Sequence, residues 1–171
     1  MALPTAANSK ALTLANVKEA LANASWFQTW AGAADAAAAR AKIIIEFRLG
    51  ADLPTRPYVI LRLVGYRRDK VALSTHGPGG GVLHILAVHD VSSSYRTVGE
   101  EANLDAENNW GALLDGLSDW QQTVGTVRVE LGTIEELMPP ELPDPAEMDE
   151  ESARYPYWIA ECSTIIGPEA L

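Results

Sequence analysis

The segment from Val82 to Asp90 constrains the fold most, because it has the length of a strand and carries apolar residues on both of its faces. A strand of this kind is covered on both sides, by helices, by a second sheet or by another subunit. We therefore expect a sheet with this strand inside it, and the other segments are interpreted around that strand.

Four further strands and two main helices are expected around it. Alternating apolar residues predict the strands at 42–48, 58–66, 126–131 and 157–166. Helical spacing predicts one helix at 14–24 after an N-cap at Thr13, one at 105–122, and a short alanine-rich helix at 36–41 capped by Asp35. This order favours an α+β fold, with a mostly antiparallel or mixed sheet of about four to five strands and two main helices packed on one face.

The length of 171 residues suits one domain. Residues 1–11 are expected to form a flexible N-terminal tail, and residues 12–171 a single domain with extended loops at 67–81 and 138–154. The first loop holds the glycine-rich run HGPGGG at 76–81, and the second is rich in proline and carboxylates. The stretch 71–75 could be a short strand or an arm.

Composition and charge exclude several classes of protein. A formal net charge of −10 repels nucleic acid over most of the surface. No apolar run approaches the roughly 20 residues of a membrane span, and residues 1–10 lack the pattern of a secretory signal. The lone cysteine, Cys162, cannot form an internal disulfide and is expected to be a buried apolar residue.

No reactive motif emerges from the chain. There is no phosphate-binding loop followed by Lys-Ser/Thr, and Gly116-Leu117-Ser118 lacks the second glycine of a nucleophile elbow. We therefore expect no enzyme activity, no catalytic, cofactor-binding or metal-binding residues, and no cofactor.

The histidines offer the best alternative to that view. On a regular strand His84 and His89 point to opposite faces, while His84 and Asp90 share a face but lie roughly 20 Å apart. His89, Asp90 and Ser92–Ser94 are neighbours that rarely converge as a triad would. A small-ligand-binding or hydrolytic domain using His84, His89 and Asp90 is the alternative that these residues leave open.

Charged clusters suggest contacts between copies of the chain. The carboxylates in and beside the second loop lack the spacing of an EF-hand and form a solvated loop, a weak cation-binding site or a docking surface for a basic partner: Glu141, Asp144, Glu147, Asp149, Glu150 and Glu151. A set of basic residues gathers near one strand end: Arg62, Arg67, Arg68 and Lys70, with Arg128 as a possible addition. Unlike patches on one subunit are what a head-to-tail ring interface needs, and ordinary solvated charges are the alternative.

Four segments carry a resemblance to a known family: 16–30 (NVKEALANASWFQTW), 56–60 (RPYVI), 106–120 (AENNWGALLDGLSDW) and 149–167 (DEESARYPYWIAECSTIIG). In layout, over about residues 12–168, the chain resembles the tail terminator (tail completion, head-tail joining) proteins of long-tailed bacteriophages and prophages. The likeness lies in an opening helix that ends in an aromatic cluster, a strand that begins with Arg-Pro, a sheet-covering helix, and a closing aromatic strand.

The resemblance implies a structural virion protein. Such proteins form a ring, expected to be a hexamer, that caps the tail tube and joins it to a head-completion or neck protein. DNA passes through the lumen without specific binding, and no membrane is involved. The expected location is the virion tail or neck, and the host cytoplasm during assembly. A neck or head-completion connector is the nearest alternative.

Overall fold

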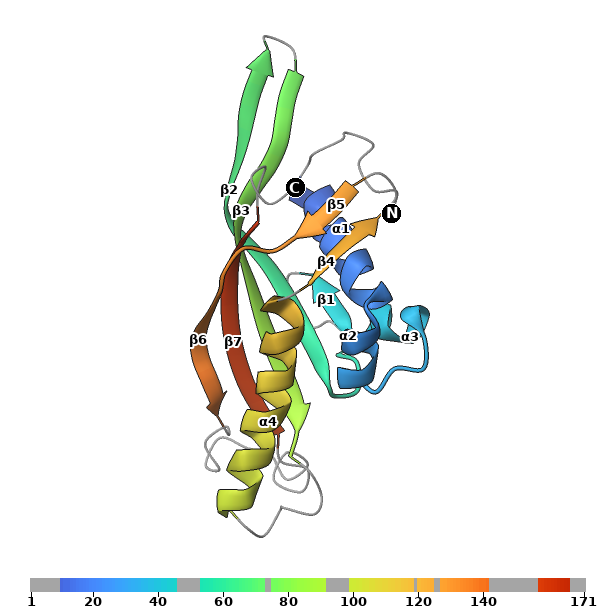
Figure 1. The fold of residues 1–171 in the computed structure, drawn as a ribbon, viewed down its shortest axis with the longest axis vertical. Coiled ribbons are helices and arrows are strands. Elements are labelled where there is room, and N and C mark those ends of the chain that lie inside the picture. The colour runs from blue at the N-terminus through green and yellow to red at the C-terminus, as the bar shows by residue number, and fades with distance from the viewer. Residues whose placement is uncertain are drawn as a thin grey trace.

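A five-stranded sheet runs along the long axis of the molecule (Figure 1). The structure, a computed structural model, describes residues 10–45, 53–72, 75–91, 99–118, 120–124, 127–141 and 157–166. The sheet has the order β1-β2-β3-β7-β6. Its strands are β1 (Ile43–Ile45), β2 (Tyr58–Ala72), β3 (Thr75–Asp90), β7 (Tyr157–Ile166) and β6 (Ile134–Glu141).

The sheet is mixed. Strand β1 runs parallel to β2, whereas β2 with β3, β3 with β7 and β7 with β6 are antiparallel. Strand β3 lies in the middle, as its apolar sequence predicts. Two further strands, β4 (Gln121–Val124) and β5 (Val127–Glu130), form a separate two-stranded sheet. The α+β prediction is confirmed.

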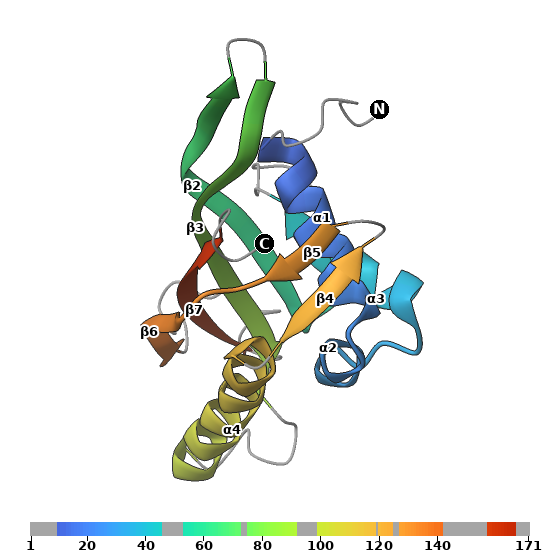
Figure 2. The ribbon, with the colours of Figure 1, turned by 45° about the horizontal axis from the view of Figure 1, so that its top comes forward.

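The helices gather on one face of the five-stranded sheet (Figures 1 and 2). They are α1 (Lys10–Asn23), α2 (Ser25–Trp30), α3 (Ala36–Ala41) and α4 (Gly99–Ser118). The residues of β3 that point toward them, Leu83, Ile85 and Ala87, are at most 1% exposed. Helix α4 contributes a buried stripe at helical spacing: Ala102, Ala106, Trp110, Leu113 and Leu117.

Local sequence explains the start of α3. The side chain of Asp35 accepts a hydrogen bond from the backbone N–H of Ala38 at 2.8 Å, so it satisfies one of the free donors of the first turn. The short helix 36–41 and its cap therefore lie where the sequence predicts them, as does the closing strand 157–166.

Several boundaries differ from expectation. Helix α1 begins at Lys10 rather than after Thr13, so the predicted tail is too long by at least two residues; residues 1–9 lie outside the described ranges. Helix α4 spans 99–118 rather than 105–122. Glu100 and Glu101 occupy its first turn, where carboxylates interact favourably with the helix dipole, and Gln121 instead pairs with Glu130 in the small sheet.

The predicted loop at 67–81 is wrong. Residues 67–72 extend β2 and residues 75–81 belong to β3. Register shifts interrupt the pairing between Val64 and Arg67 and twice more toward the tip, which lets a glycine-rich strand pair with a charged one. At Gly81 a Cβ would lie 2.7 Å from the carbonyl oxygen of Val64, so the close backbone approach requires glycine there.

The second predicted loop, 138–154, begins too early. Strand β6 continues to Glu141 and includes Met138, Pro139 and Pro140. Proline has no backbone N–H to donate to the hydrogen bonds between strands. It is tolerated here because β6 is an edge strand with register shifts. Residues 142–156 lie outside the described ranges.

Among the described residues, no helix combines the length and the apolar character needed to cross a membrane.

Candidate functional site

His89 lies in the core side of the sheet, within an array of aromatic rings. Its ring stacks on Trp158 with centroids 5.4 Å apart and an interplanar angle of 2°, and it meets the edge of Trp30 at 5.5 Å. Its Nδ1 lies 2.9 Å from its neighbour's backbone oxygen, Asp90 O. These contacts make His89 part of the packing between α2, β3 and β7.

The array extends in both directions and contains every tryptophan of the chain. Successive ring contacts of 5.4–6.4 Å link its seven members in the order Trp120, Trp26, Phe27, Trp30, His89, Trp158 and Trp110. At one end, Trp110 Nε1 donates to Glu136 Oε2 at 2.6 Å, which ties α4 to β6. Trp30 Nε1 donates to the backbone oxygen of Asn109 at 3.0 Å and ties α2 to α4.

Asp90 belongs to a different small cluster. Arg56 Nε lies 2.8 Å from Asp90 Oδ1, and the Arg56 guanidinium lies 4.6 Å from the centre of the Tyr157 ring. Asp90 and Tyr157 are register partners on β3 and β7. Arg56 therefore fastens the chain just before β2 to the end of the sheet.

His84 lies on the sheet face opposite His89, and it is six residues from Asp90 along β3. Its Nδ1 lies 2.7 Å from Glu161 Oε1, and each of the two side chains is 30% exposed. Cross-strand neighbours of His84 are Arg62 on β2 and Ser163 on β7. The prediction that His84 and His89 lie on opposite faces is confirmed, so the two histidines and Asp90 do not converge on one pocket.

The third histidine and the serines of the possible triad add no reactive site within the described ranges. His76 lies near the tip of the β2–β3 hairpin, and Ser92–Ser94 lie outside those ranges. Within the part of the chain that the structure describes, no group of three or more His, Cys, Asp or Glu residues is placed to hold a metal ion. The Gly116-Leu117-Ser118 run lies inside α4, where the sequence places it.

Cys162 is fully buried in β7. Burial raises the pKa of its thiol to about 12, with Glu161 and Glu136 adding to the effect. A buried thiol with so high a pKa is a packing residue and a poor nucleophile, as the sequence predicts.

The sheet face opposite the helices is covered at one end only. Tyr58 and Val88 are 7% and 4% exposed there. Toward the other end, Val64, Val82 and Ile165 are cross-strand neighbours on β2, β3 and β7, with exposed fractions of 36%, 37% and 67%. We call these three residues the apolar row. Three adjacent exposed aliphatic side chains form a patch typical of a contact surface.

Beyond the apolar row, β2 and β3 leave the sheet as a two-stranded hairpin. We call residues 67–72 and 75–80 the arm; it projects past the other described helices and strands in both views (Figures 1 and 2). Arg67 pairs with Gly80, Arg68 with Gly79 and Lys70 with His76. Three of the four residues 67–70 are cationic, in a chain with a net charge of −10.

The predicted basic patch is thus divided. Arg62 is exposed on β2 next to the apolar row, and Arg67, Arg68 and Lys70 continue along the same strand into the arm. Arg128 belongs to β5 in the separate two-stranded sheet. Of the predicted acidic cluster only Glu141 lies within the described ranges, at the end of β6.

A second exposed patch lies on α4 and escaped the sequence prediction. Leu104 is 58% exposed, and Glu100, Glu101 and Glu107 lie four and three residues before it and three after it, so all share one helix face. All three glutamates are exposed. We call these four residues the α4 acidic face. Leu104 lies off the stripe that α4 buries.

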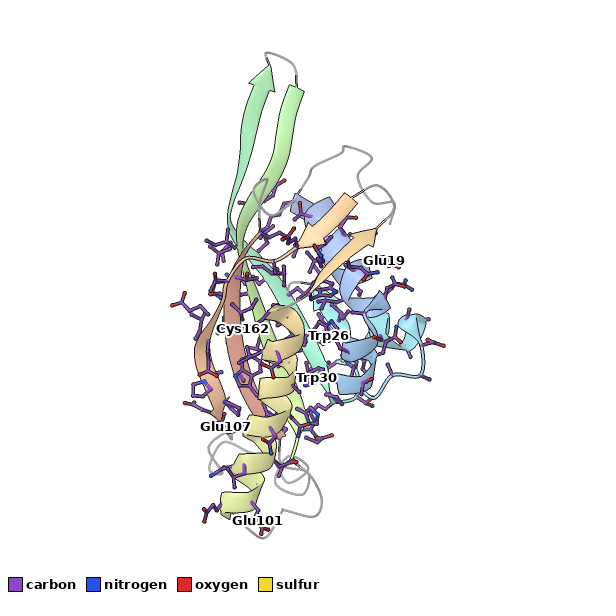
Figure 3. The ribbon with its side chains drawn as sticks, viewed as in Figure 1. Glu19, Trp26, Trp30, Glu101, Glu107 and Cys162 are labelled. Atoms are coloured by element: carbon purple, nitrogen blue, oxygen red, sulfur yellow. The ribbon has the colours of Figure 1, made fainter. Side chains whose placement is uncertain are left out.

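The arm and the α4 acidic face lie at opposite ends of the molecule. In Figure 3, Glu101 lies at the bottom end of α4 with Glu107 just above it, while the arm is at the top. One end of the long axis is therefore cationic in sequence and the other carries carboxylates.

Compared with known proteins, the chain matches no family model and no curated sequence.

Proposed function

We propose that this chain is a structural, non-catalytic subunit that assembles into a ring, as tail terminator proteins do at the end of a bacteriophage tail tube. The arm is the observation that carries this proposal. A two-stranded hairpin is at best marginally stable alone in water, so an arm of this length gains most from a partner that covers it.

The apolar row and the charge distribution support the same role. Exposed aliphatic residues at the root of the arm extend the surface that a partner would bury. The net charge of −10 suits a ring through which DNA passes without being captured. The layout that the resemblance rests on is also present: α1 leads into the aromatic residues of α2, α4 covers the sheet, and β7 closes it.

In this proposal the ring is a hexamer that contacts the tube protein on one side and a head-completion or neck protein on the other, in the virion. A neck or head-completion connector is the nearest variant, and it differs in the surface that the ring caps. Exposed interaction surfaces support both variants, whereas the separation of His84 from His89 gives a hydrolytic site no support.

The test is electron microscopy of the purified protein, alone and mixed with tail tubes assembled from the same genome. Six-fold rings, or caps confined to tube ends, are the expected result. A protein that leaves the tubes bare and open-ended but binds portal assemblies would replace the terminator with the connector. A protein that binds neither would contradict both.

A further inference from the structure

We propose that copies of this chain associate head to tail, with the arm and apolar row of one copy seated on the α4 acidic face of the next. This inference rests on the proposed ring-forming role and specifies its contact surface. The partner that the arm binds is a second copy of this chain.

Charge complementarity is the first argument. The arm carries Arg67, Arg68 and Lys70 against the single carboxylate Asp69. Helix α4 carries five carboxylates and neither Lys nor Arg in its sequence GEEANLDAENNWGALLDGLS. Opposite charges across an interface steer association and fix which surfaces meet.

Apolar complementarity is the second argument. Leu104 is a 58% exposed leucine among three exposed glutamates, and Ile165 is a 67% exposed isoleucine next to Val64 and Val82. Arg62 borders this row because it is exposed two residues before Val64 on β2. Each surface thus combines aliphatic and charged residues, and the charges of the arm and of helix α4 are of opposite sign, although Glu135 and Glu161 also lie on the sheet face that carries the apolar row. Burying both apolar groups together removes each from water.

Position along the molecule is the third argument. The arm lies at one end of the long axis and the α4 acidic face at the other (Figures 1 and 3). Two different surfaces at opposite ends make a contact that repeats from copy to copy. Such a contact closes into a ring when the rotation between neighbours allows it.

The test uses two charge-reversed variants that are each unable to associate alone but carry complementary charges when mixed. Arg67→Glu/Arg68→Glu makes the arm acidic, and Glu101→Lys/Glu107→Lys makes the helix face basic. Each variant alone would place like charges across the contact, so each is expected to sediment as a monomer where the wild type associates. An equimolar mixture restores opposite charges at every contact, and it is expected to associate as the wild type does.

The matched control is Ala34→Lys/Ala41→Lys/Glu141→Lys. It makes the same change in net charge as Glu101→Lys/Glu107→Lys, at exposed positions outside helix α4 and the apolar row. It is expected to sediment like the wild type, and circular dichroism checks that all variants are folded. Association of either charge-reversed variant alone, or a mixture that stays monomeric while the wild type associates, would overturn the proposed contact.

Cysteine cross-linking captures the same contact when association is weak. Because Cys162 is fully buried, Arg68→Cys and Leu104→Cys each add one reactive thiol. Mixed under mild oxidation, the two variants are expected to give several-fold more disulfide dimer than either variant alone. No such excess, together with a monomeric wild type, would refute the contact.

The two proposals fail in different ways. Charge-reversed variants that still cap tubes would leave the ring function standing and remove this contact. A mixture that restores association in a protein that ignores tubes would keep the contact and remove the terminator function.

Discussion

At the scale of single residues, Gly116 and Gly111 are five positions apart on α4, and only one has room for a side chain. A Cβ at Gly116 would lie within 2.7 Å of three ring carbons of Trp26, whereas a Cβ at Gly111 would meet nothing within 4 Å. Gly116 thus allows α4 to approach α2 closely, and Gly111 has no comparable role.

Gly116→Ala is therefore expected to lower the free energy of unfolding by about 1–3 kcal/mol, because Trp26 must leave its position against the core. Gly111→Ala is the matched control, and it is expected to raise the free energy of unfolding by about 0.5–1 kcal/mol through helix propensity alone. Urea unfolding followed by circular dichroism measures both. Equal effects of the two substitutions would contradict the packing described for Trp26.

Cys162 gives a second prediction at this scale. With a pKa of about 12 and no exposed surface, roughly one thiol in ten thousand is ionised at pH 8. A thiol-specific chromogenic reagent at pH 8 is expected to leave the native protein unlabelled and to label one thiol per chain in urea. Fast labelling of the native protein would place Cys162 outside the core.

At the scale of elements, an ion pair joins α1 to α3. Arg40 Nε donates to Glu19 Oε2 at 2.8 Å, a second contact joins Arg40 to Glu19 Oε1, and Asn23 Nδ2 donates to Glu19 Oε1 at 3.1 Å. The hydrogen bond from Arg40 is the largest factor that lowers the pKa of Glu19 below its usual 4.5. Both side chains are more than a third exposed, so solvent weakens the pair.

The depressed pKa of Glu19 sets the sign of its pH dependence. A carboxylate whose pKa is lower in the folded state stabilises the fold above pH 4.5, and this contribution is lost as the pH falls through the folded-state pKa. Glu19→Gln is expected to lower the urea midpoint at pH 7, with a difference from wild type that shrinks below pH 4.5. Glu141→Gln, at an exposed carboxylate that ends β6, is the control. A difference that is constant with pH would contradict the ion pair.

The elements also show how far the sequence predicts this fold. Strand β7, helix α3 and the opposite orientations of His84 and His89 follow from local patterns, because alternation and N-capping act within a few residues. The arm and β6 do not, because Gly79–Gly81 and Pro139–Pro140 have poor strand propensity and become strands only through pairing with distant segments.

The candidate surfaces were partly foreseeable. The sequence indicates the basic cluster at 62–70 and predicts contact between unlike patches. Leu104 and Ile165 were missed because a local pattern does not reveal which apolar residues stay exposed after the helices have packed. Their exposure follows from the tertiary arrangement, in which α4 buries a different stripe and the helices cover only one face of the sheet.

At the scale of the whole molecule, separated charges make association sensitive to salt. The Debye length falls from about 10 Å at 0.1 M to about 3 Å at 1 M ionic strength, so exposed charges attract less strongly. Association of the wild type is expected to weaken steadily over this range in sedimentation velocity runs. Association that strengthens with salt would indicate an apolar contact alone, and Ile165→Ser would then abolish it where Arg67→Glu/Arg68→Glu would not.

The run of rings from Trp120 to Trp110 places every tryptophan inside the body of the subunit and none in the arm. Intrinsic tryptophan fluorescence is therefore expected to change when the core unfolds and to change little when subunits associate. A single indole introduced in the arm, as in Lys70→Trp, would add an emission that changes when the arm binds a partner. Fluorescence would then follow unfolding in the wild type and association of subunits in the variant.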